Sequence, residues 1–291
     1  MSATDTTTQE RPIGRRGPYA ELFFALMRSG TFLTGFAIVL FWVICALFGE
    51  HFTPYDPLAD DIINALSPPS AEHWFGTDQI GRDVFSRVIV GSRDILTVAP
   101  LATLLATVAG TALGLFTGYF RGIADDIVSR VLEAFMAIPV VIVALLAIVA
   151  LGTSKATVIV VIGLSFAPII ARTVRSAVLA ERELDYVAAA QLRHESAFHT
   201  MFVEILPNVI PPILVETTVR LGYAIFAVAT LSFMGFGIQP PSPDWGLSIS
   251  NNYGMIGGGF LGTVLFDPLA IASLVIGVNL VTDGIQGALN D

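Results

Sequence analysis

The residues in this sequence that could do chemistry are few and scattered. His51 and His73 fall on the opposite side of a membrane from His194 and His199 in the topology derived below, and none has a ligand at zinc spacing. Cys45 is the single cysteine, so neither an intrachain disulfide nor a thiolate metal site is expected. No GxxxxGK sequence followed by Ser or Thr is present to hold a phosphate. We therefore expect no catalytic, cofactor-binding or metal-binding residues.

Ionisable residues inside apolar segments are the next candidates. Glu216 and Arg220 are four residues apart and would share one face of a helix. Such residues either line a water-filled path or pair with each other, which lowers the cost of insertion, and we favour the pair. Asp283 is expected at an interfacial or structural contact. Four acidic residues of a polar stretch could meet a protein partner, although a solvated loop is the more usual explanation: Asp56, Asp60, Asp61 and Glu72.

The amino-acid composition indicates the environment in which these residues lie. Of 291 residues, 54% are hydrophobic and 13% are charged, and the mean hydropathy is +0.74. A soluble domain is usually about 25% charged, so this balance points to lipid. The net charge of −9 gives no support to nucleic-acid binding, which usually leaves a basic face.

Uncharged runs long enough to cross a bilayer predict transmembrane helices, because lipid leaves each backbone amide to be satisfied within its own segment. We expect an all-α membrane protein with six transmembrane helices. Within a transmembrane domain at 31–291, they lie at about 31–49, 95–120, 134–154, 156–172, 209–237 and 262–289. The remaining predicted segments are an N-terminal segment at 1–30, an external loop at 50–94 and a cytoplasmic loop at 173–208.

The distribution of positive charge predicts the orientation. With the N-terminus in the cytoplasm, ten of the 15 Lys and Arg residues lie in cytoplasmic segments and four lie outside, while Arg220 is within a span. The positive-inside rule supports this arrangement, which also places the C-terminus in the cytoplasm. The protein is thus expected to be a multi-pass protein of the plasma (inner) membrane.

The cytoplasmic loop contains the sequence YVAAAQLRHESAFHTMFVEILPN, from Tyr186 to Asn208. It resembles the EAA loop of ABC importer permeases, a short helical motif that docks into a cleft of the ATP-hydrolysing subunit. Ala188 and His194 depart from the family pattern, which has an acidic residue and a glycine there. The residues assigned to ATPase coupling by this resemblance are Tyr186, Val187, Ala189, Ala190, His194, Ile205, Leu206, Pro207 and Asn208.

The motif also has a physical interpretation. Small alanines allow close approach to a partner, so we expect Ala190→Glu to block docking. Pro207 is expected to break the helix between the docking element and the fifth span.

Three further segments extend the resemblance to most of the chain after about residue 20. His73–Arg93 and Ser232–Gly246 are similar to the loops before the second span and after the fifth span in C-type permeases of dipeptide and oligopeptide importers. The last segment, from Pro268, fits the sixth span of that family, with Asn279, Asp283 and Gly284 in place. The fold implied is that of a type I ABC importer permease.

The resemblance implies a non-catalytic subunit that forms half of a translocation path for oligopeptides or dipeptides and moves by alternating access. The implied partners are a second, related permease in a heterodimer, cytoplasmic ATPase subunits that bind ATP and Mg, and an extracytoplasmic substrate-binding protein. Nickel permeases share these motifs, so nickel or another small solute is an alternative cargo. An ATP-independent channel or carrier is a less favoured alternative, and a membrane scaffold without transport is disfavoured by the proline- and glycine-interrupted spans. The residues that contact cargo are not predicted.

Overall fold

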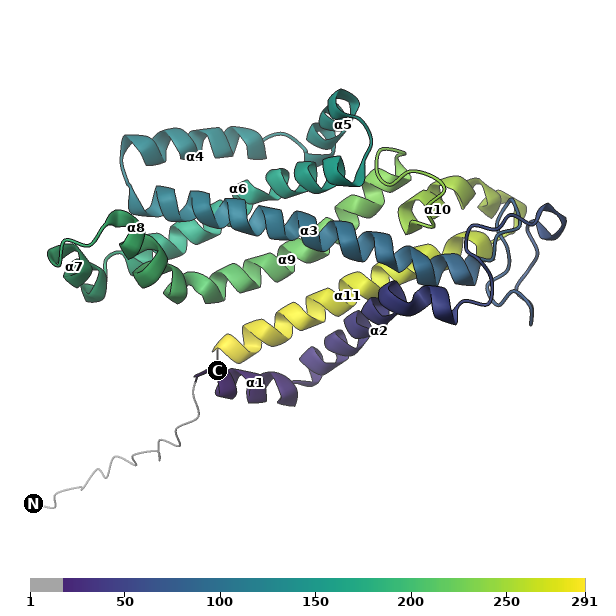
Figure 1. Cartoon of the computed structure of the whole chain (residues 1–291), viewed down its shortest axis with the longest axis horizontal. Helices are drawn as coiled ribbons and strands as arrows, with labels where there is room; N and C mark the ends of the chain where they lie inside the picture. Colours follow the sequence, from purple (N-terminus) through teal and green to yellow (C-terminus); the bar gives the residue numbers. More distant parts are fainter. Residues whose placement is uncertain (1–17, 291) are drawn as a thin grey trace, which may run out of the picture.

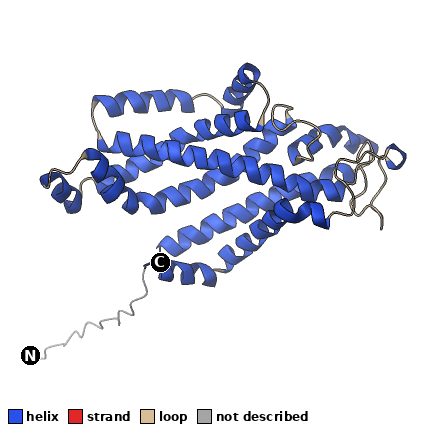
Figure 2. Ribbon diagram, viewed as in Figure 1, coloured by secondary structure: helices blue, strands red, loops and turns tan. Residues whose placement is uncertain are grey.

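The structure is a computed structural model and describes residues 18–290 (Figures 1 and 2). Within that range the chain is mostly helical, and one isolated bridge between Thr77 and Asp83 is its closest approach to β structure. The principal helices are α1 Pro18–Arg28, α2 Gly30–Phe52, α3 Val84–Tyr119, α4 Ile123–Met136, α5 Val140–Leu151, α6 Lys155–Glu181, α9 Leu206–Phe233 and α11 Gly262–Asn290. The all-α prediction is confirmed.

Five helical segments of the described chain are long and apolar enough to cross a membrane, and a bent pair would supply a sixth. The bent pair falls where the sequence predicted one helix at 134–154. There α4 ends at Met136 and α5 begins at Val140, with an 88° bend between them. Pro139 explains this correction, because proline supplies no amide hydrogen and disfavours helical geometry at the residue before it.

Other helix ends also differ from the predicted ranges. The helix expected from 95 begins at Val84, where the Asp83 carboxylate accepts a 2.8 Å hydrogen bond from the Ser86 amide. The helix expected at 156–172 continues to Glu181 and passes through Pro168. The predicted N-terminal segment 1–30 contains α1, while its residues 1–17, with Arg11, Arg15 and Arg16, lie outside the described residues.

Close packing of α3 on α6 forms the centre of the bundle. Gly110, Gly114 and Gly118 recur every four residues along one face of α3 and lie against α6. A Cβ atom at Gly114 would lie 2.6 Å from the Cβ of Val174, and one at Gly118 would lie 2.7 Å from the Cβ of Val178. Small residues thus let the two backbones approach, as they do between many transmembrane helices. In Figure 1, α2 and α11 run side by side below this pair.

Candidate functional site

The segment that resembles an EAA loop lies between α6 and α9, at the end of the bundle opposite α10 (Trp245–Asn252) (Figure 1). It consists of α7 Asp185–Leu192, a turn, the short helix α8 Ala197–His199 and a π-helical turn at Thr200–Ile205, which leads into α9. We call residues 185–208 the coupling segment. Its ends join two long helices, so a force applied to it would be carried along both.

The turn after α7 is a Schellman motif. The His194 amide donates to the Gln191 carbonyl at 3.0 Å, and the Glu195 amide donates to the Ala190 carbonyl at 3.2 Å. His194 occupies the left-handed position of this motif with a φ of 58°. The departure from glycine therefore leaves the turn intact, with a histidine in a conformation that favours glycine.

Three of the predicted coupling residues face the interior of this chain. Val187, Ala190 and Ile205 are each 0% exposed, because α7 packs on the π-helical turn. Ala189 and Leu206 are partly buried. The expectation that Ala190→Glu would block docking is corrected by this burial: a carboxylate there would disrupt the segment itself, since a buried charge without a partner is costly.

Tyr186 and Asn208 connect the two ends of the coupling segment. The Tyr186 hydroxyl donates to Glu181 Oε2 at 2.6 Å and accepts from Asn208 Nδ2 at 3.1 Å. Burial, followed by the Glu181 carboxylate, raises the pKa of Tyr186 to about 12, so the phenol remains protonated and able to donate. These bonds fix the start of α7 against the start of α9.

The helix does not break at Pro207 as predicted. The chain is continuously helical from Ala197 to Phe233 and contains a π-helical turn just before the proline. In that turn the Leu206 amide donates to the carbonyl of Met201, five residues earlier. Pro207 follows directly and has no amide hydrogen to donate to the preceding turn. The wider π-helical turn accommodates this missing donor, and the helix continues without a break.

Apolar side chains on the outside of the coupling segment were not predicted from the sequence. Leu192, Phe198 and Val203 are 81%, 67% and 55% exposed, and the Phe202 ring packs at a tilt against Phe198 with ring centroids 4.4 Å apart. We call these four residues the coupling patch. The available signal was the presence of large apolar residues in a loop outside the predicted spans. These side chains are exposed whereas Ala190 is buried, so they are accessible to a partner and Ala190 is not.

The ionisable pair inside α9 forms as favoured from the sequence. Arg220 Nε donates to Glu216 Oε1 at 2.6 Å, and each side chain is 16% exposed. The guanidinium also lies over the ring of Tyr223 at 4.9 Å. The acids Asp56, Asp60, Asp61, Glu72 and Asp283 are exposed.

The two remaining motifs meet at the end of the bundle opposite the coupling segment. Trp245 Nε1 donates to the Val88 carbonyl at 2.8 Å, and its ring packs edge-on against Trp42. Arg87 donates to the Pro57 carbonyl at 2.9 Å and to the Ser242 carbonyl at 3.4 Å. These hydrogen bonds hold together segments that are far apart in the sequence.

Asp244 is a fully buried member of this assembly. Its Oδ1 accepts from the Leu247 amide at 2.9 Å and so caps α10, while its Oδ2 has no partner among the described residues. Burial raises the pKa of Asp244 to about 6. The group therefore carries a desolvation cost when it is ionised.

Comparison with known proteins agrees with this arrangement. The family described as "Binding-protein-dependent transport system inner membrane component" matches residues 110–291, and "N-terminal TM domain of oligopeptide transport permease C" matches residues 17–69. The dipeptide transport system permease protein DppC of Alkalihalophilus pseudofirmus is 35% identical over 94% of this chain and 90% of its own. The glutathione transport system permease protein GsiD of Shigella flexneri is 34% identical over 96% and 92%.

A solved structure supports the fold. The MetNI methionine ABC transporter in an inward-facing conformation aligns with a TM-score of 0.57 at 21% identity, covering 70% of this chain and 95% of that one. The alignment shows that this chain has the fold of an ABC importer permease. With the family matches, it establishes that the chain is a member of the family of inner membrane components of binding-protein-dependent transport systems.

Proposed function

We propose that this chain is the transmembrane subunit of an ATP-driven importer of dipeptides or oligopeptides and forms half of the translocation path. The similarity to peptide permeases along nearly the whole chain is the observation that carries the proposal. A related permease would supply the other half, and an extracytoplasmic binding protein would deliver the cargo. ATP and Mg would be bound by separate ATPase subunits.

The coupling segment is assigned to contact with an ATPase subunit. It projects beyond the long helices, it presents the coupling patch outward, and its buried residues make it a compact unit that can move as one. Closure of the ATPase pair would displace this unit and, through α6 and α9, alter the path between the two permeases. The helical arrangement would then alternate between two states that ATP and cargo stabilise differently.

The orientation proposed places the coupling segment and both termini in the cytoplasm. The excess of Lys and Arg in the predicted cytoplasmic segments supports it. The same orientation puts the assembly around Trp245 and Arg87 outside, where a binding protein would dock.

Site-specific crosslinking tests the ATPase contact. We expect Leu192→Cys, in membranes that contain the complete importer, to crosslink to an ATPase subunit because Leu192 is 81% exposed in the coupling patch. Tyr253→Cys is the matched control, since Tyr253 is 59% exposed at the opposite end of the bundle. Crosslinking from Tyr253 and not from Leu192 would place the ATPase at the end of the bundle opposite the coupling segment. That result would overturn the assignment.

Cargo is tested by ligand-dependent ATPase activity of the assembled importer with its binding protein. Di- and oligopeptides are expected to stimulate hydrolysis. Nickel chelates form the second arm because nickel permeases share the sequence motifs. Stimulation by the nickel chelates and not by the peptides would show that the cargo is nickel and would overturn the peptide assignment.

A further inference from the structure

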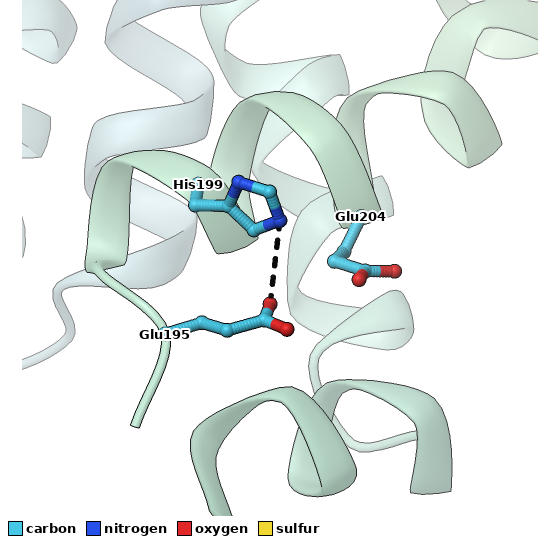
Figure 3. Close-up of side chains that lie close together, drawn as sticks. All are labelled: Glu195, His199 and Glu204. Atoms are coloured by element: carbon cyan, nitrogen blue, oxygen red, sulfur yellow. Dashed lines mark ion pairs between the residues drawn. The ribbon is translucent and has the colours of Figure 1, made fainter. Parts of the chain in front are cut away.

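We propose that Glu195, His199 and Glu204 form a binding site for a divalent transition metal of the zinc class within the coupling segment. Figure 3 shows Glu195 in the turn and His199 in α8 directed toward each other, with Glu204 of the π-helical turn beside them. The site is independent of the proposed function, since it is formed by this chain alone.

The geometry of the donor atoms supports a metal. One imidazole nitrogen and two carboxylate oxygens lie within 4.8 Å of one another, and His199 Nε2 is 3.5 Å from Glu195 Oε2. Tetrahedral ligands bonded to zinc at about 2.1 Å are separated from each other by roughly 3.4 Å. The His199–Glu195 distance already matches this value, and a rotation of the Glu204 side chain would bring in the third ligand.

The second carboxylate oxygen of Glu195 provides a second reason. Arg193 Nε binds Glu195 Oε1 at 2.7 Å, and Arg193 also reaches Glu204 Oε1 at 3.3 Å. Glu195 Oε2 is a buried atom that makes no hydrogen bond among the described residues, and its ion-pair neighbour is His199 Nε2 at 3.5 Å. A cation held between this oxygen and the imidazole nitrogen would give the carboxylate a stronger partner than the long contact to His199. Arg193 would then orient both carboxylates from behind, as outer groups do around metal ligands.

The donor set selects the class of metal. Zn²⁺ accepts imidazole and carboxylate ligands and often has three protein ligands and a water molecule. Mg²⁺ prefers oxygen ligands and keeps several waters, so the imidazole disfavours it. This set was not predicted from the sequence, although a Glu and a His four residues apart on a helical segment were a readable signal.

A bound metal would join the turn that contains His194 to the π-helical turn. Because the ligands come from residues 195, 199 and 204, it would close a loop in the part of the chain that carries the coupling patch. Fixing that loop would reduce the freedom of the coupling segment.

Direct metal binding tests the site in the purified, tag-free importer without ATP or peptide. The probes are Zn²⁺, followed by calorimetry, and Co²⁺, whose visible absorption reports tetrahedral coordination. We expect one more metal per importer in the wild type than in His199→Ala or Glu204→Gln, or an affinity about 100-fold or more higher, in the presence of excess Mg²⁺. Glu204→Gln retains the shape of the side chain and guards against misfolding.

His51→Ala is the control, because His51 is an exposed histidine at the end of α2 and outside the cluster. It should bind metal like the wild type. Equal binding by the wild type, His199→Ala and Glu204→Gln would overturn the site, as would equal loss in His51→Ala. Since neither ATP nor cargo is present, that result would leave the proposed import function untouched.

Discussion

Replacement of His194 by glycine should stabilise the turn at the centre of the coupling segment. His194 has a φ of 58° at the left-handed position of the Schellman motif, and its side chain is exposed, so truncation removes little packing. A left-handed conformation costs an L-residue with a Cβ about 1–2 kcal/mol. Glycine avoids that cost but loses roughly 0.5–1 kcal/mol more conformational entropy on folding.

From the middle of each range, the net gain is about 0.75 kcal/mol, which corresponds to a change of roughly two- to fivefold in the local opening equilibrium. Hydrogen exchange of the amides of His194 and Glu195 reports that equilibrium when closing is faster than exchange, because both donate the bonds that define the turn. We expect exchange at the Glu195 amide to slow two- to fivefold in His194→Gly.

Gln191→Gly is the matched control. Gln191 is also exposed but lies within α7, where glycine costs about 1 kcal/mol relative to good helix formers. Exchange should therefore accelerate about fivefold in this variant. If His194→Gly also accelerated exchange, or left it unchanged, the inferred strain in the turn would be incorrect.

Three further changes test other parts of the structure. Asp244→Asn should stabilise the assembled protein by up to about 3 kcal/mol at pH 7.5. The folded pKa of about 6 exceeds the unfolded value of about 3.9, so stability falls as pH rises between these values and the cost is fully present above pH 6. Melting at pH 7.5 and 4.5 checks this, and an equal gain at both would refute it. Tyr186→Phe removes the hydrogen bonds to Glu181 at the end of α6 and to Asn208 in α9, and it should cost about 1–3 kcal/mol locally. The cost would appear as faster amide exchange in α7, and protection equal to wild type would contradict this. Ala190→Glu should lower the yield of assembled importer, whereas Ala188→Glu, at an exposed position, should assemble normally; equal yields would show that burial of Ala190 is unimportant.

The sequence was most informative about the bundle, because lipid imposes a simple rule on apolar length. Uncharged runs located the helices, but not their continuity: Pro139 divides one predicted span, whereas Pro168 lies inside α6. A proline alone does not specify which of these occurs, since the outcome depends on whether packing around the helix compensates for the missing hydrogen bond.

A coupling role for residues 186–208 was predicted from the sequence, but the exposed surface of this segment was not. Ala190 was expected to face a partner and instead packs inside, while Phe198 and Leu192 face outward. The direction of each side chain depends on how α7 folds back on the π-helical turn. Residues in that contact are too far apart in the sequence for helical periodicity to reveal it. His194 occupies a left-handed position that a glycine would have indicated, so the sequence did not predict the geometry of this turn.

ATP-dependent uptake in vesicles tests the central claim most directly. The chain would be reconstituted with its partner permease and ATPase subunits, supplied with its binding protein and a labelled dipeptide, and compared with vesicles that contain this chain alone. We expect uptake in the complete system with ATP, and none when ATP or this chain is left out. Dipeptide uptake through this chain alone, without ATP or an ATPase subunit, would contradict the importer-subunit assignment.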